Sequence, residues 1–176
     1  MRFEFDPENY DANRGKHGVS LSFGARAFED ADHLLIPTFR EEDGEDRYKV
    51  IGIVDGKFWT AVHSVMAIQC VSFRSGEATM AKKSSILLEA DPGDTEDFPV
   101  DRAALDRAHM GRRIRRLRKR LGLTQEGFAE QYGIPLSAIR QYEIARTMPP
   151  PAVRAYLTVI EREPEMAARA LHPDAA

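Results

Sequence analysis

The sequence predicts two domains of different fold class, an α+β domain followed by an all-α domain. Residues 1–79 contain short β-rich runs separated by turn residues, whereas apolar residues from position 106 onward recur at helical spacing. The charge changes at the same place: residues 1–79 hold nine Lys or Arg against fourteen Asp or Glu, and residues 106–176 hold thirteen against eight. Between them, residues 80–105 hold three against six and contain Pro and Gly, as is typical of a linker. We therefore expect domains at 1–79 and 106–172 joined by an acidic linker, 80–105.

The first domain is predicted to contain two helices and an antiparallel sheet. Phe3 and Phe5 alternate with polar residues as in a strand, Asp6-Pro7 begins a helix that runs to about Lys16, and residues 20–28 form a second helix. β-rich runs follow at 34–37, 48–54, 58–63 and 68–73, with a hairpin turn at Asp55-Gly56. Helices followed by an antiparallel meander give an α+β domain.

The second domain is predicted to begin with a basic helix. Eight basic residues and no acidic one lie between Arg107 and Arg120, while Ile114, Leu117 and Leu121 keep an apolar stripe. A basic helix of this kind suits contact with phosphates. Further along the chain, Pro149-Pro150-Pro151 opens another helix, whose apolar face is expected to complete the core: Val153, Tyr156, Leu157 and Ile160.

Two short helices joined by a tight turn are predicted between these helices. Thr124 can cap the first, which ends at Gly133, where a left-handed residue is often needed. Pro135 suits the first position of the second, residues 136–144, in which Ile139 and Tyr142 are expected to be buried. The residues of this second helix that are expected to point outward are Leu136, Ser137, Arg140 and Gln141.

At this point the sequence resembles the Xre, or lambda-repressor-like, family of helix-turn-helix domains, which includes antitoxins that repress their own operons. The resemblance rests on the spacing of Gln125, Ala129, Gly133, Ile139 and Glu143. It implies that the second helix enters the major groove of double-stranded operator DNA, with the protein bound as a homodimer. The implied DNA-binding residues are Gln125, Leu136, Ser137, Arg140 and Gln141, with Arg146 and Thr147 as phosphate contacts. The alternative is a helical hairpin of another all-α domain, in which Ala129 and Gly133 only allow close packing.

Residues 1–79 resemble a second family, the RelE-like BrnT ribonuclease toxins of type II toxin–antitoxin systems. The matching segments are Phe3-Glu4-Phe5-Asp6, Asn13, residues 16–20, Ala27-Phe28, residues 45–48, Gly52, His63 and Ser72-Phe73-Arg74. Carried over by position, the candidate residues for RNA binding and cleavage are Lys16, His17, Arg47, His63 and Arg74. Cations can stabilise a pentavalent phosphate and histidine can move a proton, so no metal or other cofactor is required. Alternatively, the two histidines are turn and strand residues of a scaffold, and the two arginines are salt-bridge partners.

The sequence also departs from the toxin pattern. Residues 64–67 replace a charged loop, Gln69 stands where an arginine is usual, and residues 75–79 replace a charged closing helix. These changes indicate a weakened enzyme. The segment Met80-Ala81-Lys82-Lys83 resembles the start of a separate antitoxin, so we interpret the chain as a toxin–antitoxin fusion. Residues 81–100 have the charge and apolar anchors to cover a basic active surface, as flexible antitoxin segments do.

Three functions follow from these expectations. The first is a DNA-binding repressor of toxin–antitoxin type with a weakened or inhibited toxin-like domain; the second is an active or self-inhibited, metal-independent ribonuclease. The third is a non-catalytic module that binds RNA or a protein.

The sequence predicts neither a metal site nor a membrane segment. The acidic run at 41–46 lacks the ligand spacing of a calcium loop. With no apolar run of membrane-spanning length and no signal peptide, we expect a cytoplasmic bacterial protein.

Overall fold

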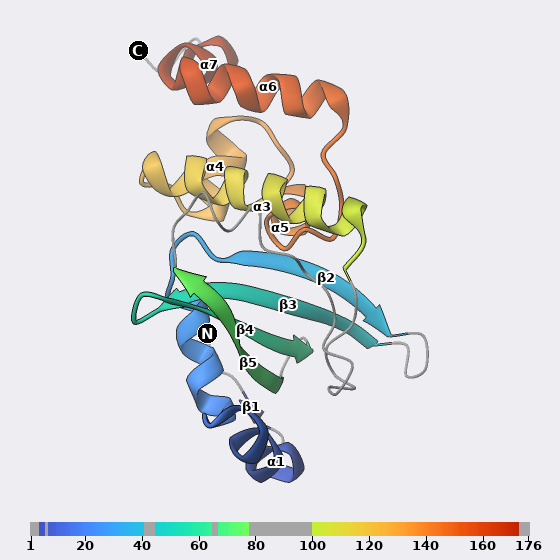
Figure 1. Ribbon diagram of the computed structural model, residues 1–176. Coiled ribbons are helices and arrows are strands. Elements are labelled where there is room, and N and C mark those ends of the chain that lie inside the picture. Colours follow the sequence, from blue (N-terminus) through green and yellow to red (C-terminus); the bar gives the residue numbers. More distant parts are fainter. Residues whose placement is uncertain (1–3, 6, 41–44, 65–66, 78–99, 173–176) are drawn as a thin grey trace. The chain divides into compact units, whose positions relative to one another are not determined.

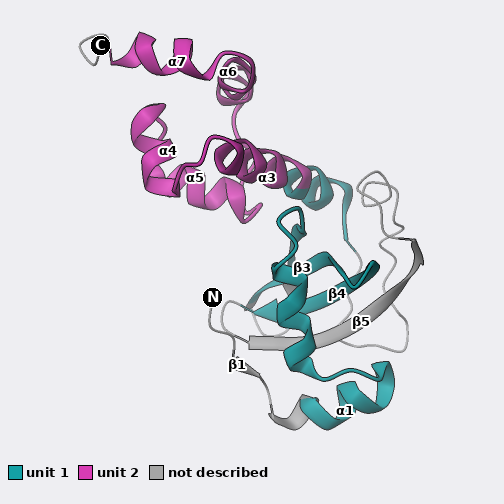
Figure 2. Ribbon diagram, turned by 90° about the vertical axis from the view of Figure 1, so that its left-hand side faces the viewer, with its two compact units in different colours: residues 1–108 teal, residues 109–176 magenta. Residues whose placement is uncertain are grey.

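The computed structural model describes residues 4–5, 7–40, 45–64, 67–77 and 100–172. The chain divides into two compact units, residues 1–108 and 109–176 (Figures 1 and 2). The division falls inside α3, a helix of nineteen residues from Arg102 to Arg120. This helix begins within the segment that the sequence assigns to the linker.

The first unit has the predicted α+β architecture. Its described residues form a five-stranded sheet in the order β1-β5-β4-β3-β2, in which β1 is parallel to β5 and the other neighbours are antiparallel. The expected helix over 20–28 is a 3-10 helix, η1. The elements are β1 (Glu4–Phe5), α1 (Pro7–His17), η1 (Leu21–Phe28), β2 (Leu34–Arg40), β3 (Glu45–Val54), β4 (Lys57–Ser64) and β5 (Ala67–Glu77).

η1 packs on one face of this sheet, which we call the covered face. Ala27 on η1 lies in one buried cluster with Val50 and Val54 of β3, and Leu21 packs with Ala61 of β4. Gly52 allows the close approach, because a Cβ at this position would lie 2.2 Å from the Ala27 carbonyl oxygen. Since side chains alternate along a strand, the neighbours of Val50 on β3 point to the opposite face.

The predicted hairpin turn at Asp55-Gly56 is confirmed. Both residues have positive φ, 50° and 73°, as a two-residue turn between twisted strands requires. The Asp55 carboxylate accepts two hydrogen bonds from the Arg26 guanidinium, at 2.8 and 2.9 Å. This pair joins η1 to the turn and lowers the pKa of Asp55.

The second unit is all-α, as predicted. It consists of the rest of α3 with α4 (Gln125–Gln131), α5 (Leu136–Glu143), α6 (Pro151–Arg162) and α7 (Pro164–Leu171). Ile114 of α3, Phe128 of α4, Ile139 of α5 and Ile160 of α6 are each at most 1% exposed and share one core. This core holds α5 in a fixed place against the other helices.

Three consecutive helices of this unit end in the same way. After α3, α4 and α5, a residue with φ between 60° and 70° is followed by an amide that bonds back to a carbonyl five residues earlier. Glycine supplies the left-handed residue in the first two, Gly122 and Gly133, but Ala145 supplies it in the third. These tight ends keep the connections short.

Candidate nucleic-acid interfaces

The predicted pair of short helices is α4 and α5. The Thr124 hydroxyl accepts a hydrogen bond from the Gly127 amide at 3.0 Å and so caps α4, as expected. Pro135 was expected at the first position of the second helix, but it stands just before that position. Its ψ of 132° is not helical, and α5 starts at Leu136. The arrangement is that of a helix-turn-helix.

Four of the seven residues predicted to bind DNA belong to α5. Ser137 and Arg140 are exposed and Gln141 is half-buried; three- and four-residue spacing places them on neighbouring parts of one face. Arg146 and Thr147 are exposed just beyond the helix. Leu136 differs from its expected outward position, since it is half-buried and packs against the core because its apolar side chain gains more there.

Arg140 is held by Glu126 across the turn. Its Nη2 donates to Oε1 of Glu126 at 2.8 Å, and the two side chains are 55% and 60% exposed. The pKa of Glu126 is lowered, first by its own backbone amide and then by Arg140. An exposed pair of this kind is weak, so Arg140 can exchange Glu126 for another partner.

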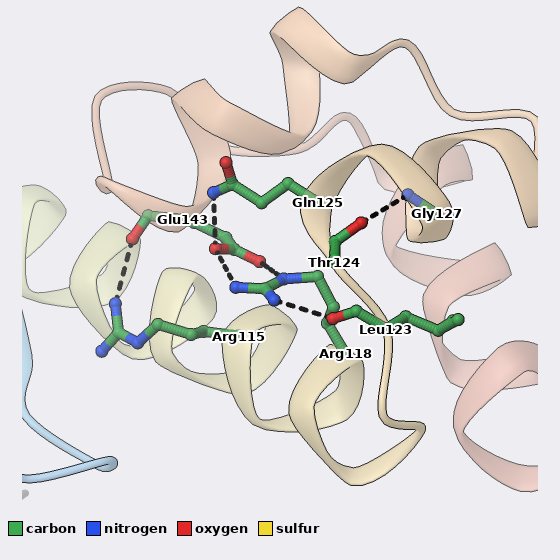
Figure 3. A network of polar contacts seen from close by, with 7 residues as sticks. All are labelled: Arg115, Arg118, Leu123, Thr124, Gln125, Gly127 and Glu143. Carbon is green, nitrogen blue, oxygen red and sulfur yellow. Dashed lines mark hydrogen bonds and ion pairs between the residues drawn. The ribbon is translucent and has the colours of Figure 1, made fainter.

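Behind this surface, the carboxylate of Glu143 joins three helices (Figure 3). Arg118 on α3 donates from Nε and Nη2 to its two oxygens at 2.6 and 2.9 Å, and Nε2 of Gln125 donates to Oε2 at 2.8 Å. Glu143 is 4% exposed, and its hydrogen bonds raise the pKa of Arg118. Gln125, predicted to approach DNA, therefore also fixes the start of α4 to the end of α5.

The basic residues of α3 do not form one surface. Arg115 is buried, and its Nη1 donates to the Glu143 carbonyl at 3.2 Å, while Arg118 binds the Glu143 carboxylate. Of the eight between 107 and 120, only Arg116, Lys119 and Arg120 are exposed. The positive charge counted in the sequence thus serves partly to hold α5.

In the first unit, His63 lies on the covered face of the sheet. It is 5% exposed, stacks on Tyr48 at 5.4 Å between ring centroids, and meets Phe28 edge-on at 5.0 Å. Its Nδ1 is 2.6 Å from the Ser64 carbonyl oxygen. Burial lowers the pKa of His63, so the neutral ring is favoured.

Arg47 lies on the opposite face. It pairs with Ser64 of β4 next to the Tyr48–His63 pair, so the strand alternation directs its side chain away from His63. Arg47 is 5% exposed, and Lys49, two residues along on the same face, is fully buried. The structure therefore does not place Arg47 and His63 together on one surface.

The other candidate residues for cleavage lie elsewhere. Lys16 is exposed and His17 is half-buried at the end of α1. Arg74 pairs with Phe58 in the sheet register, but its side chain lies outside the described part of the structure. Lys49 was not predicted, although its two-residue spacing from Arg47 in a β-rich run is a sign that the two share a face.

Among the described residues, no three His, Cys, Asp or Glu side chains are grouped so that they could hold a metal ion. No described helix has the length and apolar composition needed to cross a membrane.

Comparison with known protein families agrees with both halves of this description. Residues 5–79 match the family model of the ribonuclease toxin BrnT of type II toxin–antitoxin systems. Residues 109–170 match a model of a helix-turn-helix domain. A search of curated proteins found no match. The chain thus joins a domain of the BrnT toxin family to a helix-turn-helix domain.

Proposed function

We propose that this chain is a cytoplasmic repressor of toxin–antitoxin type, with an Xre-like domain that recognises an operator in double-stranded DNA through α5. The observation that carries the proposal is the exposed side of α5, where Ser137 and Arg140 lie on a helix fixed by the buried Glu143 network. A rigid helix with polar side chains on its outer side is what base recognition in the major groove needs.

Each predicted contact has a chemical role on this account. Arg140 suits guanine and Gln141 suits adenine, because their donors and acceptors match those base edges. Ser137, in the first turn of α5, also faces bases on this account. Arg146 and Thr147 follow the end of the helix, where their side chains suit phosphates. Gln125 keeps its amide oxygen for DNA while its nitrogen donates to Glu143.

We propose that the repressor binds as a homodimer. Three large apolar side chains of α6 and α7 are well exposed: Val159, Met166 and Leu171, at 50%, 60% and 47%. We assign the dimer surface to these side chains because association would remove their exposed apolar area from water. Sedimentation of Met166→Glu beside the unmodified chain tests this surface; an unchanged dimer would exclude it.

Arg140→Ala tests the α5 surface directly. If Arg140 contacts a base, its loss weakens operator binding by about 1–3 kcal/mol and relaxes the preference at one base pair. The measurement is the dissociation constant for the DNA upstream of the gene that encodes this chain, and for single-base variants of that DNA. Unchanged operator affinity would remove Arg140 from the recognition set.

Glu126→Gln is the matching variant on the other side of the pair. Arg140 has to leave Glu126 before it can contact a base, so removing the carboxylate tightens operator binding. The gain is expected to shrink in the Arg140→Ala background. An equal gain in both backgrounds would mean that Glu126 acts only through general charge.

A second candidate function, an inhibited ribonuclease that binds RNA, is favoured by the burial of Arg47 and Lys49 on one face of the sheet. Cations that bind RNA have to reach solvent, so burial of both suits an inactive state. We propose that the acidic segment of the chain, which includes Glu89, Asp91, Asp94, Glu96 and Asp97, maintains this state through its charge.

The test uses the full chain with these five acidic residues replaced by Asn or Gln. Release of an inhibited enzyme predicts RNA cleavage by this variant, and loss of cleavage when Arg47→Ala is added. Cleavage that persists with Arg47→Ala would exclude this site. Tight RNA binding without cleavage would instead favour the non-catalytic interaction module.

A further inference from the structure

A groove in the second unit lies between α3 and α6, apart from the exposed side of α5. It has a volume of about 470 Å³, and Leu117 contributes an apolar part of its wall. Its polar lining is His109, Arg112, Arg113, Arg116, Arg120 and Glu161. Four guanidinium groups thus surround one groove with a single carboxylate among the lining residues.

Helix geometry separates this groove from the recognition helix. Gly111, Arg115 and Arg118 form the side of α3 that contacts the end of α5. At about 100° per residue, Arg116 and Arg120 point roughly 140–180° away from Gly111. α5 and α6 accordingly lie on different sides of α3 (Figure 1). A duplex bound by α5 would leave the groove available to another ligand.

Contacts with α6 position part of the lining. Arg113 Nη2 lies 2.5 Å from Glu161 Oε2 and 3.1 Å from the Thr158 hydroxyl, and Arg120 Nη2 donates to the Glu161 carbonyl at 3.0 Å. Arg112 Nη2 lies 3.2 Å from Nδ1 of His109, which acts as the acceptor because a guanidinium only donates. The groove is therefore a built feature of two packed helices.

We propose that the α3–α6 groove is a phosphate-binding site, separate from the surface of α5. Guanidinium groups form bidentate hydrogen bonds with phosphate oxygens, and a phosphate offers more charge and more acceptor oxygens than a carboxylate. The volume lies in the range of small-ligand sites. The lining also extends over three turns of α3, about 16 Å, enough for successive phosphates of a nucleic-acid strand. The phosphates belong either to a free polyphosphate compound or to such a strand.

The first arm of the test is calorimetric titration of the full chain with tripolyphosphate. Arg112→Ala/Arg116→Ala is expected to weaken binding by about tenfold or more. Arg162→Ala/Arg169→Ala removes the same charge from exposed positions outside the groove and is expected to keep the affinity within about twofold. Arg116→Glu changes one exposed side chain and should also lose binding, which guards against misfolding of the double variant.

The second arm distinguishes the two sources of phosphate. The affinity of Arg112→Ala/Arg116→Ala for a scrambled duplex is measured at several salt concentrations. If a nucleic-acid strand uses the groove, this variant loses two phosphate contacts, and the slope of log affinity against log salt becomes less steep by about 2. If only free polyphosphates use the groove, this slope stays unchanged while tripolyphosphate binding is lost. Equal tripolyphosphate binding by the groove and control variants, or equally tight binding of polyglutamate to the unmodified chain, would overturn the proposal.

Discussion

At the end of α5, the buried carboxylate of Glu143 accepts hydrogen bonds from Arg118 and Gln125. Glu143→Gln removes the charge that compensates Arg118, whose side chain is only 13% exposed. We expect the second unit to lose about 2–4 kcal/mol of stability, because a partly buried guanidinium is left without its carboxylate. Urea unfolding followed by circular dichroism at 222 nm measures this loss.

Glu126→Gln is the control for this prediction. It breaks the same type of Arg–Glu pair, but at a site where both side chains are more than half exposed. Solvent screens such a pair, so the unfolding midpoint should stay where it is. If both variants unfold at the midpoint of the unmodified chain, Glu143 has no structural role.

His63 predicts a pH dependence of the first unit. Its pKa in the folded state lies below the ordinary 6.5 because of burial, so the unfolded chain binds the proton more readily. The stability from neutral His63 is complete above pH 6.5 and is lost as the pH falls through the lower folded pKa. We expect His63→Phe to reduce the loss of stability between pH 7.5 and 5.5, measured by fluorescence of the single tryptophan, Trp59. An identical loss in the variant would contradict this role.

At the scale of elements, the packing of α3 against α5 depends on the close approach of Gly111 to the backbone of α5. A Cβ there would lie 2.6 Å from the Tyr142 carbonyl oxygen and 3.1 Å from that of Glu143, both backbone atoms that cannot turn aside. Gly111→Ala should cost about 1–3 kcal/mol and weaken operator binding by displacing α5. Gly127→Ala, where the nearest atom is a side-chain oxygen at 3.4 Å, should be neutral or stabilising by up to about 1 kcal/mol. Equal effects of the two substitutions on thermal unfolding would rule out this account.

The sequence predicted elements well where local residues determine them. Thr124 and Gly133 mark the ends of α4 through their own chemistry, and Asp55-Gly56 marks a hairpin. It could not predict the left-handed conformation of Ala145, which is fully buried, because alanine does not favour that conformation. Nor did the sequence predict the 3-10 form of η1, which packs closely on the sheet at Gly52.

For the whole molecule, the β-rich runs and the helical spacing predicted two units of different class, and the charge changed at the same place in the chain. Charge alone could not show how individual cations are used, because that depends on packing between distant segments. Arg118 binds a glutamate twenty-five residues away, and Arg113 binds one forty-eight residues away. The same limit applies to Arg47 and His63, whose separation onto two sheet faces follows from strand register.

The central claim, sequence-specific DNA binding through α5, is tested most directly by a salt titration of the full chain. Its dissociation constant is measured for its own upstream duplex and for a scrambled duplex of the same composition. The account predicts much tighter binding of the native duplex, and a log affinity that falls with log salt by about 0.9 for each phosphate contact. Equal affinity for the two duplexes, or no binding to either, would contradict it.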